Sequence, residues 1–151
     1  MNSKTPINLN DSWHYLFADE ANIDLRTIQQ ESLMWVPLTK LSDWLIASSV
    51  ENGTDWFWRT ININRAVTRD QTRFVLKIHK VPDDVLIYVN GKLIGQVQGL
   101  HAFKADITPH IKSGNNDIMF KLTSSRFSNC GGRFGDISLN LIRGSVAARL
   151  H

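Results

Sequence analysis

The stretch Val81 to Ile111 reads VPDDVLIYVNGKLIGQVQGLHAFKADITPHI. Its segment Val85–Val89 alternates β-branched residues with Leu and Tyr, which is the period of a β-strand. Asn90-Gly91 follows directly and precedes a second apolar run. A two-residue type I′ turn needs positive φ at both central residues, which Asn tolerates and Gly adopts freely. The sequence therefore predicts a β-hairpin whose register is fixed by its turn.

The same alternation recurs along the chain. Residues 55–63, DWFWRTINI, place Phe57, Arg59, Ile61 and Ile63 on one face of a strand and Trp56, Trp58, Thr60 and Asn62 on the other. Further alternating runs are centred on Tyr15, Leu76, Phe120 and Leu139. Eight or nine short strands separated by turns, with almost no helical pattern, predict an all-β sandwich.

Two segments fit this pattern less directly. Trp35-Val36-Pro37 contains a proline, which cannot donate to a sheet ladder, so we expect an edge or crossing segment and not a central strand. The polar segment 18–32 is compatible with one short helix or with an ordered loop.

Composition bounds the class of protein. The 151 residues suffice for one domain, 1–151, and the net charge of +3 arises from scattered Lys and Arg that trace no phosphate backbone, so nucleic acid is not an expected partner. Cys130 is the single cysteine, which excludes an internal disulfide. No apolar run approaches a membrane span and the N-terminus lacks an apolar leader, so we expect no membrane partner and a cytoplasmic location.

The order of these motifs resembles the sugar-binding jelly-roll domain (galactose-binding-like) of glycoside hydrolase family 2. The resemblance rests on YVNG at 88–91, Gly99, Phe103, Asp106-Ile107-Thr108 and the glycine-asparagine turn at 114–116, and it extends from Ile7 to about Ile142. It implies a jelly-roll β-sandwich like the N-terminal domain of β-galactosidases, β-glucuronidases and β-mannosidases, here standing alone.

This sequence departs from the family pattern at two positions. Asp11 stands where the family commonly has Gly, so the first bend is expected to be built differently. Gly135 stands where Arg is usual, and the polar residue that lines the sugar site in some β-galactosidases has no secure counterpart. A direct galactoside contact is therefore not implied.

Catalysis is not expected. The family's two catalytic glutamates belong to a separate (β/α)₈ barrel of about 250 residues, for which 151 residues leave no room. Glycoside hydrolysis needs two carboxyls roughly 5 to 10 Å apart, whereas Asp19-Glu20 and Asp83-Asp84 are adjacent residues that we interpret as solvated turn carboxylates.

Cofactors and metals are not expected either. The five histidines and one cysteine show no zinc-ligand spacing. A structural calcium, with Asp11 or Asp106 as contributor, stays open. Cys130 is interpreted as a small residue in a glycine-rich bend.

The candidate carbohydrate-binding residues combine rings with hydroxyl-binding groups, because sugar C–H faces pack on aromatic rings while polar side chains take the hydroxyls. Trp13 and Trp35 are assigned to the core, and Trp44 is a further candidate. The predicted site residues are Trp56, Trp58, Arg126, Asn129 and Arg133.

The sequence thus predicts a non-catalytic carbohydrate-binding module. The alternative is a structural or interaction protein that uses the same sandwich to bind another protein or its own copy as a homo-oligomer.

Overall fold

The computed structural model describes residues 6–18, 35–43, 54–64, 72–99, 101–123 and 133–143. These residues form strands joined by turns, together with two 3₁₀ turns, η2 (Leu41–Asp43) and η4 (Thr108–His110). The strands are β1 (Ile7–Asn8), β2 (Asp11–Ala18), β3 (Val36–Lys40), β4 (Thr54–Ile63), β5 (Thr72–Ile78), β6 (Val85–Val89), β7 (Lys92–Val97), β8 (Phe103–Asp106), β9 (Gly114–Thr123) and β10 (Ile137–Arg143).

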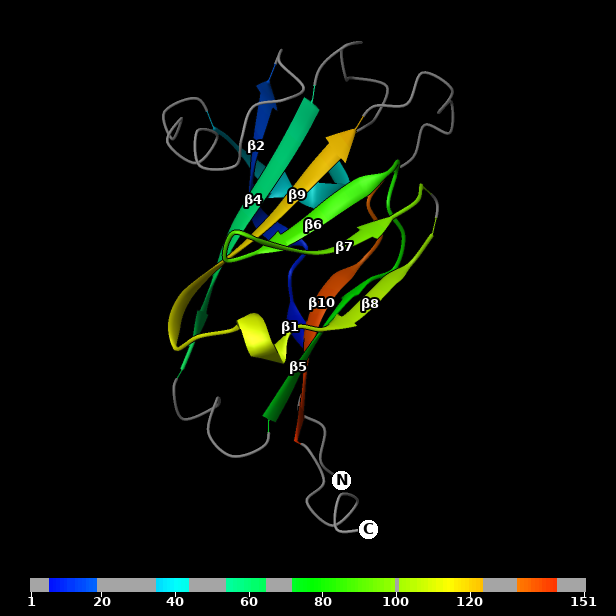
Figure 1. Ribbon diagram of the computed structural model, residues 1–151. Helices are drawn as coiled ribbons and strands as arrows, with labels where there is room; N and C mark the ends of the chain where they lie inside the picture. The colour runs from blue at the N-terminus through cyan, green and yellow to red at the C-terminus, as the bar shows by residue number, and fades with distance from the viewer. Residues whose placement is uncertain are drawn as a thin grey trace.

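The strands make two layers (Figure 1). One sheet has four strands in the order β1-β10-β5-β8, and the other has six in the order β3-β2-β4-β9-β6-β7. Every described pairing is antiparallel. The prediction of an all-β sandwich is confirmed.

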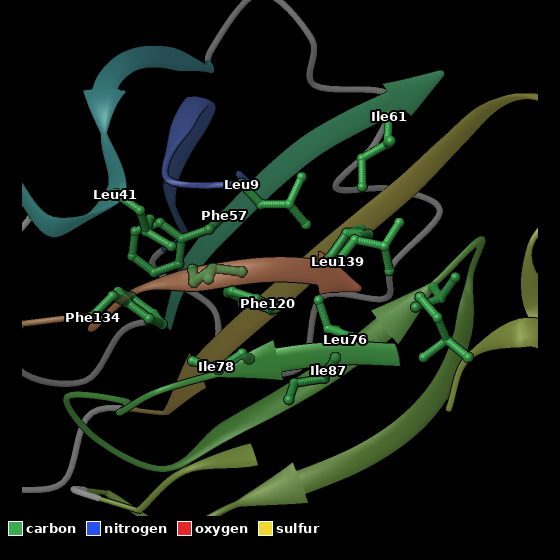
Figure 2. Packing of buried hydrophobic residues seen from close by; sticks show 14 of the residues in the cluster. Leu9, Leu41, Phe57, Ile61, Leu76, Ile78, Ile87, Phe120, Phe134 and Leu139 are labelled. Carbon is green, nitrogen blue, oxygen red and sulfur yellow. The ribbon is translucent and has the colours of Figure 1, made fainter. Parts of the chain in front are cut away.

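The main core fills the space between the two sheets (Figure 2). Phe57 and Phe120 come from the six-stranded sheet, and Leu76 and Leu139 face them from the four-stranded sheet. All four side chains are 0% exposed. Phe134 packs its ring against both Phe57 and Phe120, with centroids 5.2 and 5.6 Å away. Burial of these side chains, at about 25 cal/mol per Å² of apolar surface, is the main force holding the layers together.

The predicted hairpin is present. Asn90 and Gly91 have φ of 49° and 83°, and Val89 pairs with Lys92 across the turn. A bulge follows, because Tyr88 pairs with Leu93 while Ile87 pairs with Gly95. The turn chemistry therefore fixes the register up to the bulge, as expected from the sequence.

The segment with Pro37 also behaves as predicted. It forms β3, which pairs with β2 among the described strands and is at the edge of the six-stranded sheet. Within the described residues, no helix has the length and apolar character needed to cross a membrane.

Candidate functional site

A second apolar cluster lies on the outer face of the six-stranded sheet. Alternation along β2 and β4 turns Trp13 and Phe57 into the main core, and it turns Leu16 and Trp56 to the opposite face. Leu16, Trp35, Trp56 and Met119 are buried there, with Trp58 and Tyr88 packed against them. The expectation that Trp35 is a core residue is correct for its burial, but its cluster lies outside the space between the sheets.

Next to this cluster the outer face has a hollow of about 320 Å³, here named the tryptophan hollow. Ser12, His14, Trp35, Trp58 and Thr60 line it. The Trp35 and Trp58 rings have centroids 5.4 Å apart and planes inclined at 68°, so the two indoles meet at a steep angle. His14 and Thr60 are exposed, and the hollow thus combines aromatic walls with polar groups open to solvent.

A hydrogen-bond network fixes the Trp58 ring. Trp58 Nε1–H donates to Asp117 Oδ1 over 2.8 Å, and the Thr60 hydroxyl donates to the same oxygen over 3.2 Å. Thr60 and Asp117 are directly opposite in the β4–β9 pair. Because both donors share one carboxylate oxygen, Trp58 and Thr60 are held in a fixed relation.

The hairpin turn supports this network from behind. Asn90 Oδ1 accepts the Asp117 backbone N–H over 2.9 Å, and Asn90 Nδ2–H donates to the His110 carbonyl and to Asn116 Oδ1. Asn116 is fully buried. The motif that decides the fold therefore also positions β9 beside Trp58.

The first bend of the domain is built at Asp11 and Ser12. Asp11 is the first residue of β2, and the positive φ of 65° falls on Ser12, at the rim of the hollow. Arg59 Nε–H donates to the Asp11 carbonyl over 2.7 Å, and the Arg59 guanidinium pairs with the Asp11 carboxylate at 3.2 Å. Arg59 thus holds the bend at Asp11 in place.

The three predicted site residues that the structure describes, Trp56, Trp58 and Arg133, do not line one hollow. Trp58 lines the tryptophan hollow, whereas Trp56 is 1% exposed, so its ring face is closed to a ligand and the prediction of a Trp56 platform is wrong. The Trp56 ring instead packs near Tyr88, and the Lys121 ammonium lies 5.4 Å from its centroid.

Of the three polar candidates, only Arg133 belongs to the described residues. It is exposed, and its guanidinium donates to the Ser42 carbonyl over 3.4 Å. Neither residue is among those that line the hollow. Arg126 and Asn129, like Trp44 and Cys130, lie outside the described residues.

Sequence reasoning missed His14, Ser12, Thr60 and the position of Trp35. The signal for them was present, since His14 and Thr60 share the face of Trp58 by alternation in β2 and β4. What the sequence lacked was the pairing of β3 with β2, which brings Trp35 beside Trp58.

Gly135, which replaces the family's usual Arg, is packed against the backbone of the neighbouring strand end. Its N–H donates to the Lys80 carbonyl over 2.8 Å, and a Cβ there would lie 3.1 Å from the Lys80 nitrogen. Close approach therefore explains the glycine.

Asp55, the second residue of β4, carries a buried carboxyl. Asp55 is 1% exposed and faces the space between the sheets, where the Tyr15 hydroxyl donates to Asp55 Oδ1 over 2.6 Å. Burial raises the pKa of Asp55 to about 6, and the bond from Tyr15 opposes that rise. Thr54 pairs with Thr123, the last residue of β9, and Asp55 is opposite Leu122.

The other carboxylates have structural partners. Asp83 is 3% exposed, so its interpretation as a solvated turn residue is wrong, and Asp84 Oδ1 accepts the Gly99 N–H over 2.9 Å. Burial raises the pKa of Asp106, but the Thr108 hydroxyl and N–H and the Arg73 guanidinium together lower it below its ordinary value. The described residues contain no group of three or more His, Cys, Asp or Glu side chains placed to hold a metal ion.

Comparisons with known proteins give a consistent result. No family model matches this chain. A curated protein from Formosa agariphila, provisionally named a β-glucuronidase, is 30% identical over 131 residues, which are 82% of this chain and 15% of that protein.

Solved structures share the fold. A glycosyl hydrolase family 2 member from Bacteroides cellulosilyticus matches 90% of this chain and 20% of its own, with a TM-score of 0.68 and 16% identity. The β-glucuronidase of Bacteroides uniformis matches 91% of this chain and 18% of its own, with a TM-score of 0.64 and 20% identity. This chain therefore spans between 15% and 20% of the lengths of these relatives.

Proposed function

We propose that this chain, which is a jelly-roll domain of the glycoside hydrolase family 2 type, is a carbohydrate-binding module that performs no catalysis itself. The premise rests on the sandwich fold and on the shared sequence with a protein named as a β-glucuronidase. The single observation that carries the proposal is the tryptophan hollow.

The hollow has the composition that sugar recognition requires. Trp58 and Trp35 offer indole surface on which pyranose C–H groups can pack, and His14, Ser12 and Thr60 offer hydroxyl-binding groups around it. A volume of about 320 Å³ is at the lower end of the range for small-molecule sites, which favours one sugar unit.

The ring is also held ready for a ligand. The Trp58 Nε1–H donates to the Asp117 carboxylate, and this bond fixes the indole ring. A sugar that packs on the ring therefore does not have to order the Trp58 side chain first. Prior ordering of a side chain raises affinity, because immobilising a free side chain on binding costs about 0.5–1.5 kcal/mol.

The absence of catalysis is part of the proposal. The Asp84 carboxylate accepts a hydrogen bond from Gly99, and the Asp106 carboxylate accepts hydrogen bonds from Thr108 and Arg73. The Asp11 carboxylate pairs with Arg59. None of these carboxylates lines the tryptophan hollow. Sugar would be bound here and not cleaved.

A role in protein association is favoured less by the described surface. The large exposed apolar side chains in it are Val36, Leu93 and Ile142. Val36 and Leu93 are on β3 and β7, which are opposite edges of one sheet, and Ile142 is on β10 of the other. These side chains therefore form no common patch of the kind that protein interfaces need.

A glycan array with the purified protein, followed by calorimetric titration of the glycans that bind, tests the proposal. We expect Trp58→Ala, His14→Ala and Thr60→Ala each to weaken binding, and Gln96→Ala, an exposed change at the far edge of the same sheet, to leave it unchanged. His14 and Thr60 are exposed, so their variants should fold normally. Binding that survives both of these changes would place the sugar site elsewhere, and a blank array would refute the proposal.

A further inference from the structure

The outer face of the six-stranded sheet continues beyond the tryptophan hollow. Trp58, which lines the hollow, is directly opposite Met119 in the β4–β9 pair, and Met119 is directly opposite Tyr88 in the β6–β9 pair. Tyr88 is in turn opposite Leu93 on β7, the last strand of this sheet. Figure 1 shows β4, β9, β6 and β7 side by side. These four residues therefore form one line across the strands, here named the apolar row.

The apolar row presents ring and aliphatic surface to solvent. Trp58 and Tyr88 are half-buried, and Leu93 is 56% exposed. Met119 is 1% exposed and belongs to the outer cluster on which the Trp58 and Tyr88 rings pack. A strip one side chain wide suits a chain-like ligand better than a protein, whose interfaces cover about 800 Å² on each partner.

A polar edge runs beside this row. Thr60 and Asp117 are directly opposite in the β4–β9 pair, each two residues away from a member of the row. Asp117 is half-buried and uses Oδ1 for the Trp58 and Thr60 donors, whereas no described residue bonds to its Oδ2. The Tyr88 hydroxyl likewise has no hydrogen-bond partner in the part of the chain that the structure describes. Both groups are thus available to sugar hydroxyls, and bonds to a carboxylate are about twice as strong as neutral ones.

The charges on the two sides of the row balance. Lys121 is on the side away from Asp117, opposite Trp56 in the β4–β9 pair, and its ammonium lies 5.4 Å from the Trp56 ring centroid. The described side chains that flank the row on β9 therefore supply one charge of each sign. Such a surface favours an uncharged ligand over an anion or a cation.

The spacing of the strands sets the length of the ligand. Adjacent strands are about 4.8 Å apart, so the backbones at Trp58 and Tyr88, which β9 separates, are about 10 Å apart. That distance is close to the length of an extended disaccharide. From His14 in the hollow to Leu93 the surface crosses β2, β4, β9, β6 and β7, which is about 19 Å and close to the length of a tetrasaccharide.

We propose that the tryptophan hollow and the apolar row together bind one extended, uncharged β-1,4-linked glycan chain that lies across the strands. The inference rests on the proposed function, since one sugar unit occupies the hollow, and it adds the class of ligand. A flat chain with equatorial hydroxyls turns its C–H faces toward Trp58, Tyr88 and Leu93 and its hydroxyl edge toward Asp117. A chain that bends leaves the row after its first units.

The test is a titration of the isotopically labelled protein with β-1,4-linked glucose and xylose oligomers, from the monosaccharide to the tetrasaccharide. We expect the affinity in at least one series to rise up to the tetrasaccharide. The monosaccharide should shift the amide NMR signals of β2 and β4, and the tetrasaccharide should also shift those of β6 and β7. Maltotetraose, whose α-1,4 links bend the chain, should bind no tighter than the disaccharide of the extended series.

Two variants on β6 and β7 give the second arm. Leu93→Ala should weaken tetrasaccharide binding by about fivefold, which corresponds to roughly 40 Å² of lost apolar contact. Tyr88→Leu keeps an apolar side chain on the outer cluster and removes the ring and the hydroxyl, so it should weaken tetrasaccharide binding by about tenfold. Both variants should bind the monosaccharide normally. Lys92→Ala is the control, because Lys92 is exposed and adjacent to Leu93 but is on the opposite face of β7 by alternation.

The outcomes separate this inference from the proposed function. If the tetrasaccharide binds no tighter than the monosaccharide, or if Tyr88→Leu and Leu93→Ala both bind it normally, the row is no part of the site and the inference is overturned, while the hollow keeps its function. If no oligomer of either series binds, the inference is also overturned, and the glycan array decides separately whether the hollow binds another sugar.

Discussion

The Tyr15 hydroxyl donates a hydrogen bond of 2.6 Å to Asp55 Oδ1, while Asp55 Oδ2 is buried without a hydrogen-bond partner among the described residues. An ionised carboxylate needs more hydrogen bonds than this when it is removed from water. The arrangement therefore favours the protonated acid, in agreement with the raised pKa of about 6.

This carboxyl should make stability depend on pH. The pKa of Asp55 rises from its ordinary value of 3.8 to about 6 on folding, so the folded state binds the proton more tightly. The resulting stabilisation is complete below pH 4, is lost as the pH rises through 6, and amounts to roughly 3 kcal/mol for a difference of about 2 pKa units. We expect the free energy of unfolding to fall over this interval in urea titrations.

Asp55→Asn provides the matched control, since the amide keeps an acceptor for Tyr15 and cannot ionise. The variant should lose the fall in stability between pH 4 and 7, whatever its absolute stability. Identical pH dependence in the two proteins would mean that Asp55 titrates normally in the fold.

The hairpin turn gives a prediction about backbone conformation. Gly91 has φ of 83° and an added Cβ would meet nothing within 4 Å, so any cost of substitution there comes from the backbone alone. Gly91→Val should lower the free energy of unfolding by about 1–3 kcal/mol, because a β-branched residue is strained at positive φ.

Gly91→Asn is the control for this change, because Asn tolerates positive φ and should cost less than Val. Gly135→Ala tests the opposite cause, since its Cβ would lie 3.1 Å from the Lys80 nitrogen and 3.1 Å from the His79 Cβ. Equal stabilities of the Val and Asn variants in thermal unfolding would contradict the assigned turn.

The hairpin was predictable because its cause is local. Asn90-Gly91 selects the turn and alternation selects the faces, and neither depends on distant parts of the chain. Alternation also predicts which residues of β9 face the core, and it predicts that Ile87 and Leu76 are buried.

The site was less predictable because it depends on pairing between distant segments. Alternation put Trp56 and Trp58 on one face correctly, but it could not tell that Trp56 is buried and Trp58 borders a hollow. Likewise, alternation places Asp55 on the same inward face as Phe57. It does not reveal the hydrogen bond from Tyr15 on β2 that accommodates the buried carboxyl. Burial of polar groups is set by tertiary contacts, which a single sequence does not display.

The chain is expected to show no glycosidase activity. Hydrolysis needs two carboxyls on either side of one glycosidic bond. In the described residues the adjacent pair Asp83-Asp84 is committed to the fold, with Asp84 bound to the Gly99 N–H. Assays of the purified 151-residue chain with nitrophenyl glycosides should give the buffer rate. Turnover that disappears when one carboxylate of this chain is changed would overturn this prediction.

The last prediction concerns the buried amides behind the tryptophan hollow. Asn90 Nδ2–H donates to the His110 carbonyl over 2.7 Å and to Asn116 Oδ1 over 2.9 Å. Asn116 cannot turn its amide to compensate, because its own Nδ2–H groups donate to Lys112 and Gly114 carbonyls. Asn90→Asp would therefore place a carboxylate oxygen against two acceptors.

We expect Asn90→Asp to lower the free energy of unfolding by about 2–3 kcal/mol, since the change removes two hydrogen bonds and leaves a carboxylate oxygen facing the His110 carbonyl and Asn116 Oδ1. The turn itself tolerates Asp, which adopts positive φ nearly as readily as Asn, so the loss reports the side-chain network and not the backbone. Asn115→Asp is the control, because Asn115 is exposed and its amide oxygen only accepts a bond from Asn62. Urea unfolding of both variants at pH 7 is the measurement. If Asn90→Asp were as stable as Asn115→Asp, the turn amide would not be the support of β9 that its bond to the Asp117 N–H indicates.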